Sequence, residues 1–389
     1  MIRICIFQPF GERRGGSDNL LLTLLRHLDR GRFEATVAFF GDGGFVEDVR
    51  ALGFEAHTFP SGRLRDPRHV VASARRARRL LERERPNLVV NWLSTAHVYA
   101  GIGAWRAGLS DRCVWFQQDL FGGRSPERAR LGDRAAASRG RMLDRVATAI
   151  PAAAIGCCSE AVRRAQDEIH PRRPTFTVLP GIDQPRQLES RDQAAVRDRL
   201  AIPADAVVVG TVGRLFAWKG HHQLVLALAE LAASESRMHG LIVGGGGHRA
   251  DARYEAYLNG LVRDHGLEGR VTFTGQVPDA TPYLQAMDVF VSASAPEPFG
   301  LVLVEALALG VPAVAVARGG PIEIIENGES GLLTPSDAPS ELAAAISRLA
   351  GDRELRLRLS ERGRERYRRR FQGDRMARDM ERRFEELAR

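Results

Sequence analysis

Short apolar runs alternate with helical stretches from one end of this chain to the other, and this alternation restricts the choice of fold more than any other feature. In the first half, the apolar runs lie at residues 3–10, 33–41, 88–94, 112–118, 152–159 and 175–183. In the second half they lie at residues 206–215, 239–247, 270–277, 288–294 and 311–317. Strands that alternate with helices are typical of parallel sheets covered by helices on both faces. The sequence therefore predicts an α/β protein.

A polar stretch at residues 185–193 interrupts the alternation, which then starts again. At 389 residues the chain is also long for a single hydrophobic core. We therefore expect two Rossmann-like, doubly wound domains, at residues 1–185 and 186–370. Residues 371–389 are highly charged and helical in character, and we expect them to form a helix that packs back on the N-terminal domain.

The charge of the chain indicates which classes of partner to expect, and its cysteines indicate the cellular compartment. The formal net charge is +8, and the positive residues are spread along the chain, which favours an anionic ligand or an anionic membrane surface over nucleic acid. The four cysteines lack metal-ligand spacing and fit a reducing cytoplasm. No run of 18 apolar residues is present, so we do not expect the chain to span a membrane.

An amphipathic pattern at residues 68–86 bears on membrane association. Apolar residues share one face of the predicted helix and arginines share the other. Two interpretations remain open: the helix rests on anionic lipid at the inner face of the membrane, near a lipid-linked acceptor, or it simply covers a sheet.

Ligands of open parallel sheets bind at the carboxyl ends of the strands, so the loops that follow strands are the places to search for a site. The first such loop contains Gly15 and Gly16 just before a helix. Glycine lets the backbone approach a bulky anion, and a helix N-terminus favours negative charge. The alternative is an ordinary tight turn between strand and helix.

A second loop, with the sequence GRLFAWKG, contains Lys219, the only lysine among the 56 lysine and arginine residues. Arg214 lies five residues earlier, so one loop carries both cations. Arginine grips two oxygens as a planar fork, whereas lysine adds a compact, mobile charge. We interpret the pair as a diphosphate site, and two solvated surface charges are the alternative.

A third loop, with the sequence APEPFGLVLVEALALG, contains Glu297 and Glu305 on either side of a turn that opens an apolar helix. We expect the amides of Phe299, Gly300 and Leu301 to be free, because the first amides of a helix have no partner within it. A carboxylate such as Glu305 in an apolar stretch requires hydrogen-bond donors, and ribose hydroxyls are suitable. A core glutamate paired with an arginine is the alternative.

Residues 205–335, with these G-R-x4-K-G and E-x7-E motifs in order, resemble the family 4 glycosyltransferases of the GT-B fold. The resemblance implies two Rossmann-like domains that face each other across a cleft, with the acceptor bound by the first domain and the nucleotide-sugar by the second. It further implies retaining transfer of a sugar from a UDP- or GDP-sugar to a glycan or lipid-linked acceptor, as in polysaccharide biosynthesis.

The resemblance also assigns roles to individual residues. Arg214 and Lys219 hold the diphosphate and stabilise the leaving group, Glu297 and the three free amides hold the sugar, and Glu305 binds the ribose. Gly15 and Gly16 approach the phosphates, and the backbone near Val277 meets the base. The sequence has no Asp-x-Asp pair of the kind that holds a metal at a diphosphate, so we expect no metal cofactor.

The first half departs from the family at one position. Many relatives carry a histidine near the reacting sugar, where this chain has Gln118, with Asp119 beside it. Glutamine can hydrogen-bond a sugar hydroxyl but cannot accept a proton. His97 is a further candidate for the sugar or acceptor pocket, and a histidine packed within a helix is the alternative.

Two other functions remain open. A nucleotide-sugar epimerase of the same fold would need paired acid and base groups at the sugar. A basic membrane or nucleic-acid adaptor with an inactive site would explain the net charge but not an intact phosphate loop.

Overall fold

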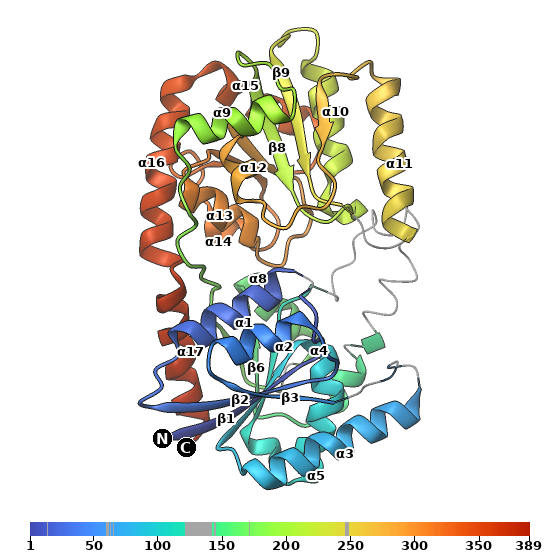
Figure 1. Cartoon of the computed structure of the whole chain (residues 1–389), viewed down its shortest axis with the longest axis vertical. Helices are drawn as coiled ribbons and strands as arrows, with labels where there is room; N and C mark the ends of the chain where they lie inside the picture. The colour runs from blue at the N-terminus through green and yellow to red at the C-terminus, as the bar shows by residue number, and fades with distance from the viewer. Residues whose placement is uncertain are drawn as a thin grey trace. The chain divides into compact units, whose positions relative to one another are not determined.

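The computed structural model describes all residues except 14, 60, 61, 63, 65, 121–141, 144, 171 and 246–248. The described residues form two compact units. The first comprises the described residues up to Asp183 together with Gln372–Arg389, and the second comprises Gln184–Phe371. Both units are built on parallel sheets (Figure 1).

The first unit contains a seven-stranded sheet with the strand order β3-β2-β1-β4-β5-β6-β7. Its strands are β1 (Ile2–Gln8), β2 (Phe33–Phe39), β3 (Glu55–Thr58), β4 (Leu88–Trp92), β5 (Cys113–Gln117), β6 (Ala154–Cys157) and β7 (Thr175–Thr177). The order reverses at β1, which pairs with β2 from Ile2↔Phe33 and with β4 from Ile4↔Leu88. The carboxyl ends of β1 and β4 therefore flank the switch point, where ligands of such sheets bind.

The second unit contains a six-stranded sheet with the strand order β10-β9-β8-β11-β12-β13. Its strands are β8 (Val207–Val212), β9 (Met238–Val243), β10 (Val271–Phe273), β11 (Val289–Ser292), β12 (Ala313–Val316) and β13 (Leu332–Thr334). The switch point lies between β8 and β11. With two such parallel sheets, the prediction of two Rossmann-like, doubly wound α/β domains is confirmed.

Helices cover both sheets. In the first unit they are α1 (Gly16–His27), α2 (Gly44–Ala51), α3 (Pro67–Glu84), α4 (Leu93–Ala96), a π-helical turn (His97–Gly101), α5 (Ile102–Arg106), α8 (Glu160–Ile169) and α17 (Gly373–Leu387). In the second unit they are α9 (Ser190–Arg199), α10 (His221–Leu231), α11 (Arg249–Asp264), α12 (Thr281–Gln285), α13 (Leu301–Leu309), α14 (Pro321–Ile324), α15 (Pro339–Gly351) and α16 (Arg353–Arg370). In Figure 1, α1 and α2 lie on one side of the first sheet and α3 and α5 on the other.

The amphipathic helix α3 shows how the sequence sets an element's ends and its buried face. Asp66 accepts a hydrogen bond from the Arg68 amide, and Pro67 occupies the first helical position, where a missing N–H does no harm. The helix stops at Arg85, which adopts a left-handed conformation (φ 46°). Its apolar face is buried against the rest of the unit, including Ala77 and Leu81.

Two strands of the structure, β3 and β13, are absent from the apolar runs of the sequence. β3 and β13 lie at the edges of their sheets, where a strand has only one paired neighbour. Neither is a long apolar run: β3 is only partly buried and β13 has three residues. Within residues 371–389, helix α17 runs from Gly373 to Leu387, shortly after α16 ends at Arg370.

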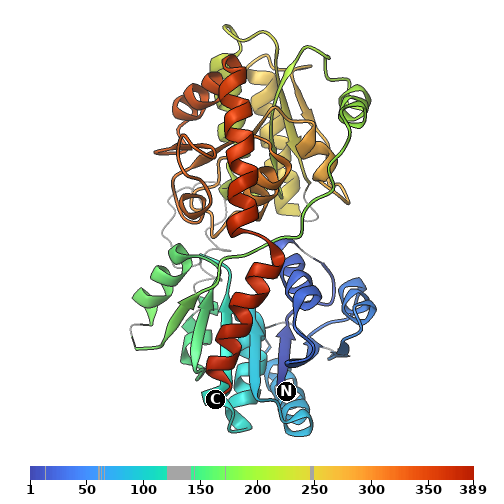
Figure 2. The same ribbon diagram turned by 90° about the vertical axis from the view of Figure 1, so that its left-hand side faces the viewer.

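The C-terminal helix α17 belongs to the first unit, where it packs on α1 (Figure 2). The Gly373 amide donates to the Ile182 carbonyl at 2.9 Å, at the start of the helix. Near its other end, the buried Glu381 accepts hydrogen bonds from the Asp29 amide at 2.8 Å and from Arg32 Nη1 at 3.2 Å. Helix α17 is thereby bonded to residues from the first part of the chain and forms part of the first unit.

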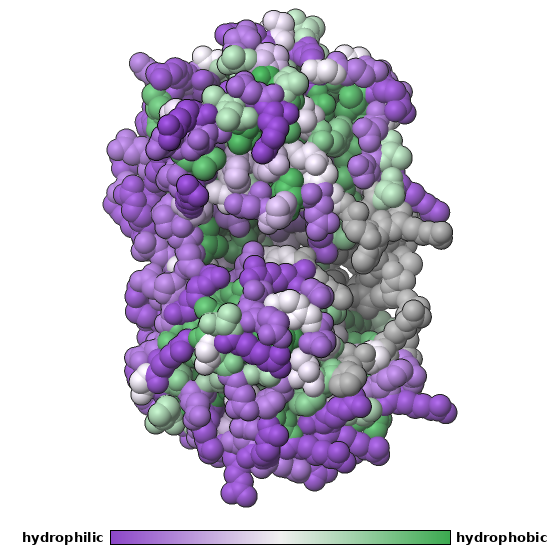
Figure 3. Space-filling view, viewed as in Figure 1, coloured by the Kyte–Doolittle hydropathy of each residue, from purple (hydrophilic) through white to green (hydrophobic). Residues whose placement is uncertain are grey.

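The surface in the view of Figure 3 is mainly hydrophilic, with hydrophobic residues in small groups between charged ones. The described helices include none that is both long and apolar enough to cross a bilayer. All four cysteines are buried and free.

Candidate functional site

The loop after β8 is closed on itself by contacts between its two ends. His221 is buried and donates through Nε2 to the Arg214 carbonyl at 3.0 Å. Burial lowers the pKa of His221 to about 4, so its ring is neutral at pH 7. Gly220 has φ 73°, and a Cβ there would lie 2.2 Å from the carbonyl oxygen of Ala293, at the end of β11. Only glycine allows this loop to pass so close to β11.

Lys219 and Glu297 come together from two different strand ends. Lys219 Nζ donates to Glu297 Oε2 at 2.7 Å, and the two side chains are 24% and 9% exposed. Nζ also lies 4.2 Å from the centre of the Trp218 ring, a cation–π distance. The ammonium group therefore contacts both a carboxylate and an aromatic ring, at the end of a side chain that is partly exposed to solvent.

Arg214 is the second predicted cation of this loop, and its side chain is exposed. The guanidinium carbon lies 4.6 Å from the centre of the Phe216 ring. Within the described part of the chain, no carboxylate pairs with Arg214, so its N–H donors are available to an anionic ligand.

The backbone at Glu297 is held by the loop that follows β12. The Gly320 amide donates to the Glu297 carbonyl at 2.9 Å, and the Glu297 amide donates to the Arg318 carbonyl at 3.3 Å. A Cβ on Gly319 (φ 85°) would lie 2.1 Å from the Glu297 carbonyl oxygen. This Gly-Gly pair is not among the predicted site residues, although two glycines soon after a predicted strand are a signal of close backbone approach.

Helix α13 begins at the turn after Glu297. Gly300 precedes the first helical residue with φ 114°, a conformation that favours glycine. The amides of Phe299, Gly300 and Leu301 make no hydrogen bond within the described residues. Free amides at a helix N-terminus attract oxygen ligands and negative charge.

Glu305 lies in the second turn of α13, half-buried, and forms neither an ion pair nor a side-chain hydrogen bond with any described residue. Burial raises the pKa of its carboxyl to about 7, and the nearby carboxylate of Asp279 adds to the effect. Asp279 and Val277 belong to the loop after β10, and Val277 is half-buried. A carboxyl with this environment accepts hydrogen bonds from a ligand readily, because no protein donor competes.

In the first unit, Gly15 and Gly16 lie at the start of α1. Asp18, which is 2% exposed, accepts from the Gly15 amide at 3.1 Å and from Gln8 Nε2 at 2.8 Å. The end of β1 and the start of α1 are thereby fixed to each other. Asp18 and Gln8 are not among the site residues predicted from the sequence.

His97 lies in the core of the first unit and has no exposed surface. Its ring stacks on Trp115 with centroids 5.1 Å apart, and its Nδ1 lies 3.0 Å from Asn91 Nδ2. Burial, followed by the charge of Arg173, lowers the pKa of His97 to about 3. The structure thus surrounds this residue with protein and keeps its ring neutral.

Gln118 and Asp119 follow β5, and both are half-buried. The side chain of Gln117 organises them: its Oε1 accepts from the amides of Gln118 at 3.0 Å and Asp119 at 3.3 Å. Gln117 Nε2 donates to Ser94 Oγ at 3.2 Å, just after β4. The sequence predicts a role for its neighbours Gln118 and Asp119, but not for Gln117 itself.

Two family models match the chain in succession. Residues 14–186 match the model described as Glycosyltransferase Family 4, and residues 192–366 match the model described as Glycosyl transferases group 1. The chain is 38% identical over 172 residues to the lipopolysaccharide core biosynthesis glycosyltransferase LpsE of Rhizobium meliloti, covering 44% of this chain and 48% of LpsE. It is 34% identical over 189 residues to the D-inositol 3-phosphate glycosyltransferase of Corynebacterium jeikeium, covering 47% and 45%.

The matched part of the chain thus spans about half the length of these curated relatives. The structural similarity covers more of the chain than these sequence matches do. The crystal structure of Anabaena HepE in complex with UDP-glucose aligns over 99% of this chain and 100% of that one, with a TM-score of 0.81 and 25% identity. The two family models, in order along the chain, together with this full-length match, confirm the resemblance. The chain belongs to the family 4 glycosyltransferases, and its two units are the Rossmann-like domains of the GT-B fold.

Proposed function

We propose that this chain transfers a sugar from a nucleotide-sugar to a glycan or lipid-linked acceptor, with retention of configuration. The observation that supports this most is the meeting of Lys219 and Glu297 beside the free amides at the start of α13. These groups lie on loops after β8 and β11, the two strands that flank the switch point of the second unit. The complex of Anabaena HepE with UDP-glucose favours a UDP-sugar as donor.

In this proposal, Lys219 and Arg214 neutralise the diphosphate of the donor. The partly exposed Lys219 side chain presents its ammonium to the phosphate oxygens, while Glu297 holds the ammonium in place. As the bond between the sugar and the diphosphate breaks, negative charge grows on the leaving group, and fixed cations lower the barrier. The arginine fork adds two hydrogen bonds from the same loop.

The remaining groups of the second unit hold the sugar and the nucleoside. Glu297 and the amides of Phe299, Gly300 and Leu301 bind the sugar hydroxyls. The unpartnered carboxyl of Glu305 accepts hydrogen bonds from the ribose, and the backbone at Val277 contacts the base. In the first unit, we propose that Gly15 and Gly16 approach the phosphates, and that Gln118 and Asp119 contact the sugar or acceptor. The full enclosure of His97 argues against its direct contact with substrate.

The proposed chemistry needs no protein nucleophile. The bond from the anomeric carbon to the diphosphate oxygen breaks, and the acceptor hydroxyl forms a new bond to that carbon on the same face. Its proton passes to the departing diphosphate oxygen. Because two cations already face the diphosphate and the sequence has no Asp-x-Asp pair, we propose that the reaction proceeds without a divalent metal.

We also propose that the chain works in the cytoplasm against the inner face of a membrane, through helix α3. Exposed arginines, among them Arg75 and Arg79, lie on its outer face, whereas Ala77 and Leu81 face the core. An arginine-rich outer face suits anionic lipid headgroups.

The test is a screen of UDP-, GDP- and ADP-sugars with the purified chain, in the presence of a chelator, with products followed by NMR. We expect one donor to release nucleoside diphosphate, and the freed or transferred sugar to keep its anomeric configuration. An epimerised nucleotide-sugar, with no nucleoside diphosphate released, would favour the epimerase instead. Loss of all activity with the chelator, restored by a metal, would refute metal independence.

A further inference from the structure

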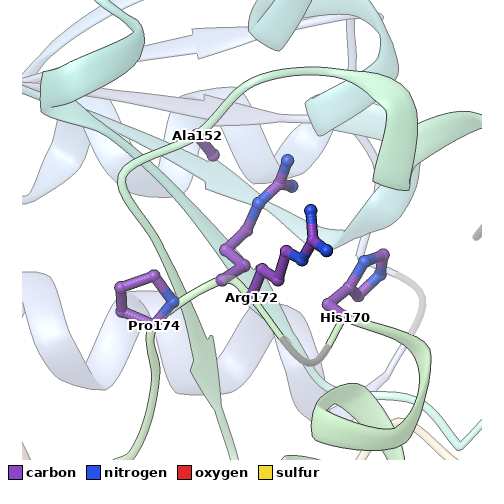
Figure 4. A pocket seen from close by; sticks show the side chains of 5 residues that line it. Ala152, His170, Arg172 and Pro174 are labelled. Carbon is purple, nitrogen blue, oxygen red and sulfur yellow. The ribbon is translucent and has the colours of Figure 1, made fainter.

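A hollow of about 360 Å³ lies in the first unit, away from the loops described above (Figure 4). Its lining residues are Ala152, His170, Arg172, Arg173 and Pro174. Ala152 comes just before β6 and Pro174 just before β7, so the hollow lies at the amino ends of these strands. Gly15, Gln118 and Asp119 follow the carboxyl ends of their strands, at the opposite edge of the sheet. The hollow is therefore a separate feature of this unit.

The charge of the hollow is positive and unbalanced. Arg172 and Arg173 are consecutive residues that both line it, and Figure 4 shows the side chains of Arg172 and His170 beside each other. No ion pair joins either arginine to a carboxylate of the described residues. Burial, rather than any neighbouring acid, dominates the environment of Arg173 and lowers the pKa of its guanidinium. Two arginines that line one hollow can share a single oxyanion, because each guanidinium offers several N–H donors.

Two nitrogen atoms of the hollow's residues are also left without a partner. Arg173 Nη2 donates to the Thr148 carbonyl at 3.3 Å, but the buried Nη1 has no hydrogen-bond partner in the described structure. The buried His170 Nε2 has none either. Buried polar groups are nearly always paired, and Arg173 Nη1 is a donor, as His170 Nε2 is in one of its two tautomers, so these atoms at a cationic hollow indicate a missing acceptor.

We propose that this hollow binds a phosphate-type oxyanion, either inorganic phosphate or the phosphate group of a small soluble phosphomonoester. Small readjustments of Arg173 and His170 turn their free N–H groups toward the oxygens, and Arg172 closes over the anion from the solvent side. Guanidinium groups match phosphate geometry and bind it with two parallel hydrogen bonds. Ala152 and Pro174 flank the site with apolar surface, which strengthens the attraction by excluding water.

The proposal is tested by titrating inorganic phosphate into the full chain by isothermal titration calorimetry, with chloride used to hold the ionic strength constant. We expect saturable binding that Arg172→Gln and Arg173→Gln each weaken about tenfold or more, since each removes charge-assisted hydrogen bonds. Arg172 is exposed, so its variant folds even if Arg173→Gln does not. Arg106→Gln, at an exposed arginine on α5 of the same unit, is the matched control and should bind as the wild type does.

A Lys219→Ala variant separates this site from the diphosphate site of the second unit, and it should retain the binding. A second titration with glycerol 3-phosphate distinguishes the free ion from a phosphomonoester, the tighter ligand being the natural form. Unchanged binding in both Arg172→Gln and Arg173→Gln would overturn the proposal. It would also be overturned if Lys219→Ala abolished phosphate binding while the two arginine variants did not. Absence of any saturable phosphate binding would overturn it as well.

Discussion

Lys219 is a predicted site residue because it is the only lysine of the chain. Its contacts explain why arginine would not replace it. Its compact ammonium fits between the Glu297 carboxylate, 2.7 Å away, and the Trp218 ring. A guanidinium is wider and planar, so it would have to displace one of these neighbours. We expect Lys219→Ala to lower kcat about 100-fold, the scale of one lost electrostatic contact in the transition state, and Lys219→Arg to be impaired as well.

The measurement is steady-state kinetics at saturating donor, with Arg237→Ala as control, because Arg237 is exposed in the same unit and its side chain has no partner among the described residues. A kcat for Lys219→Ala within a few fold of the wild type would show that the ammonium does not act on the leaving group.

The carboxyl of Glu305 makes the stability of the protein depend on pH. The pKa of its carboxyl is raised from about 4.5 to about 7, so folding favours the protonated form. The stability contributed by this group is complete below about pH 4.5 and is lost as the pH rises through about 7. Glutamine cannot ionise, so we expect Glu305→Gln to be more stable than the wild type at pH 8, by about 1–3 kcal/mol, and equal to it at pH 4.

Urea unfolding at both pH values measures this difference, and Glu329→Gln, at an exposed position, serves as control. The same variant should bind nucleotide more weakly, because an amide is a poorer acceptor for ribose hydroxyls than a carboxylate. Equal stability of the variant and the wild type at pH 8 would show that the carboxyl ionises without penalty.

At the scale of elements, the phosphate loop depends on a close approach of backbone to backbone. Gly220 and Gly266 both have positive φ, 73° and 63°, but only at Gly220 would a Cβ meet a backbone atom, 2.2 Å away. We expect Gly266→Ala to lose about 1 kcal/mol of stability from backbone strain alone. Gly220→Ala should lose clearly more and also bind nucleoside diphosphate more weakly, because the loop must move away from β11. Thermal unfolding and titration calorimetry check the pair, and equal losses would contradict the role given to this contact.

The strands also show which elements can be predicted from sequence patterns and which cannot. Central strands such as β4 and β8 are continuous apolar runs because both faces are buried, and the sequence predicts them well. The edge strands β3 and β13 carry no such pattern. In the site, a rare residue and two spaced motifs identified Lys219 and Glu297. Gln117 and the Gly319–Gly320 pair were not predicted, because their roles depend on contacts between loops that are distant in sequence.

At the scale of the whole molecule, the last helix completes the first unit. Glu381 on α17 is buried and accepts from the Asp29 amide and the Arg32 guanidinium. Glu381→Ala leaves the Asp29 amide without its acceptor and removes one of the carboxylates that bind Arg32, which keeps Glu385, so we expect the first unit to lose about 1–3 kcal/mol. Three of the four tryptophans, Trp92, Trp105 and Trp115, belong to this unit, so fluorescence during urea unfolding reports mainly on it.

The control for this prediction is Glu386→Ala, also on α17, which removes only an exposed ion pair with Arg383. If Glu381→Ala and Glu386→Ala unfold at the same urea concentration, α17 does not stabilise the first unit through Glu381.

The central claim about function is that the loops after β8 and β11 bind the diphosphate of the donor with side-chain cations. Titration of uridine diphosphate into the chain in the presence of a chelator tests it most directly. The account predicts saturable binding that Lys219→Ala weakens at least about tenfold and Arg237→Ala leaves unchanged. Binding that is equal in the wild type and Lys219→Ala, or that requires an added divalent metal, would contradict it.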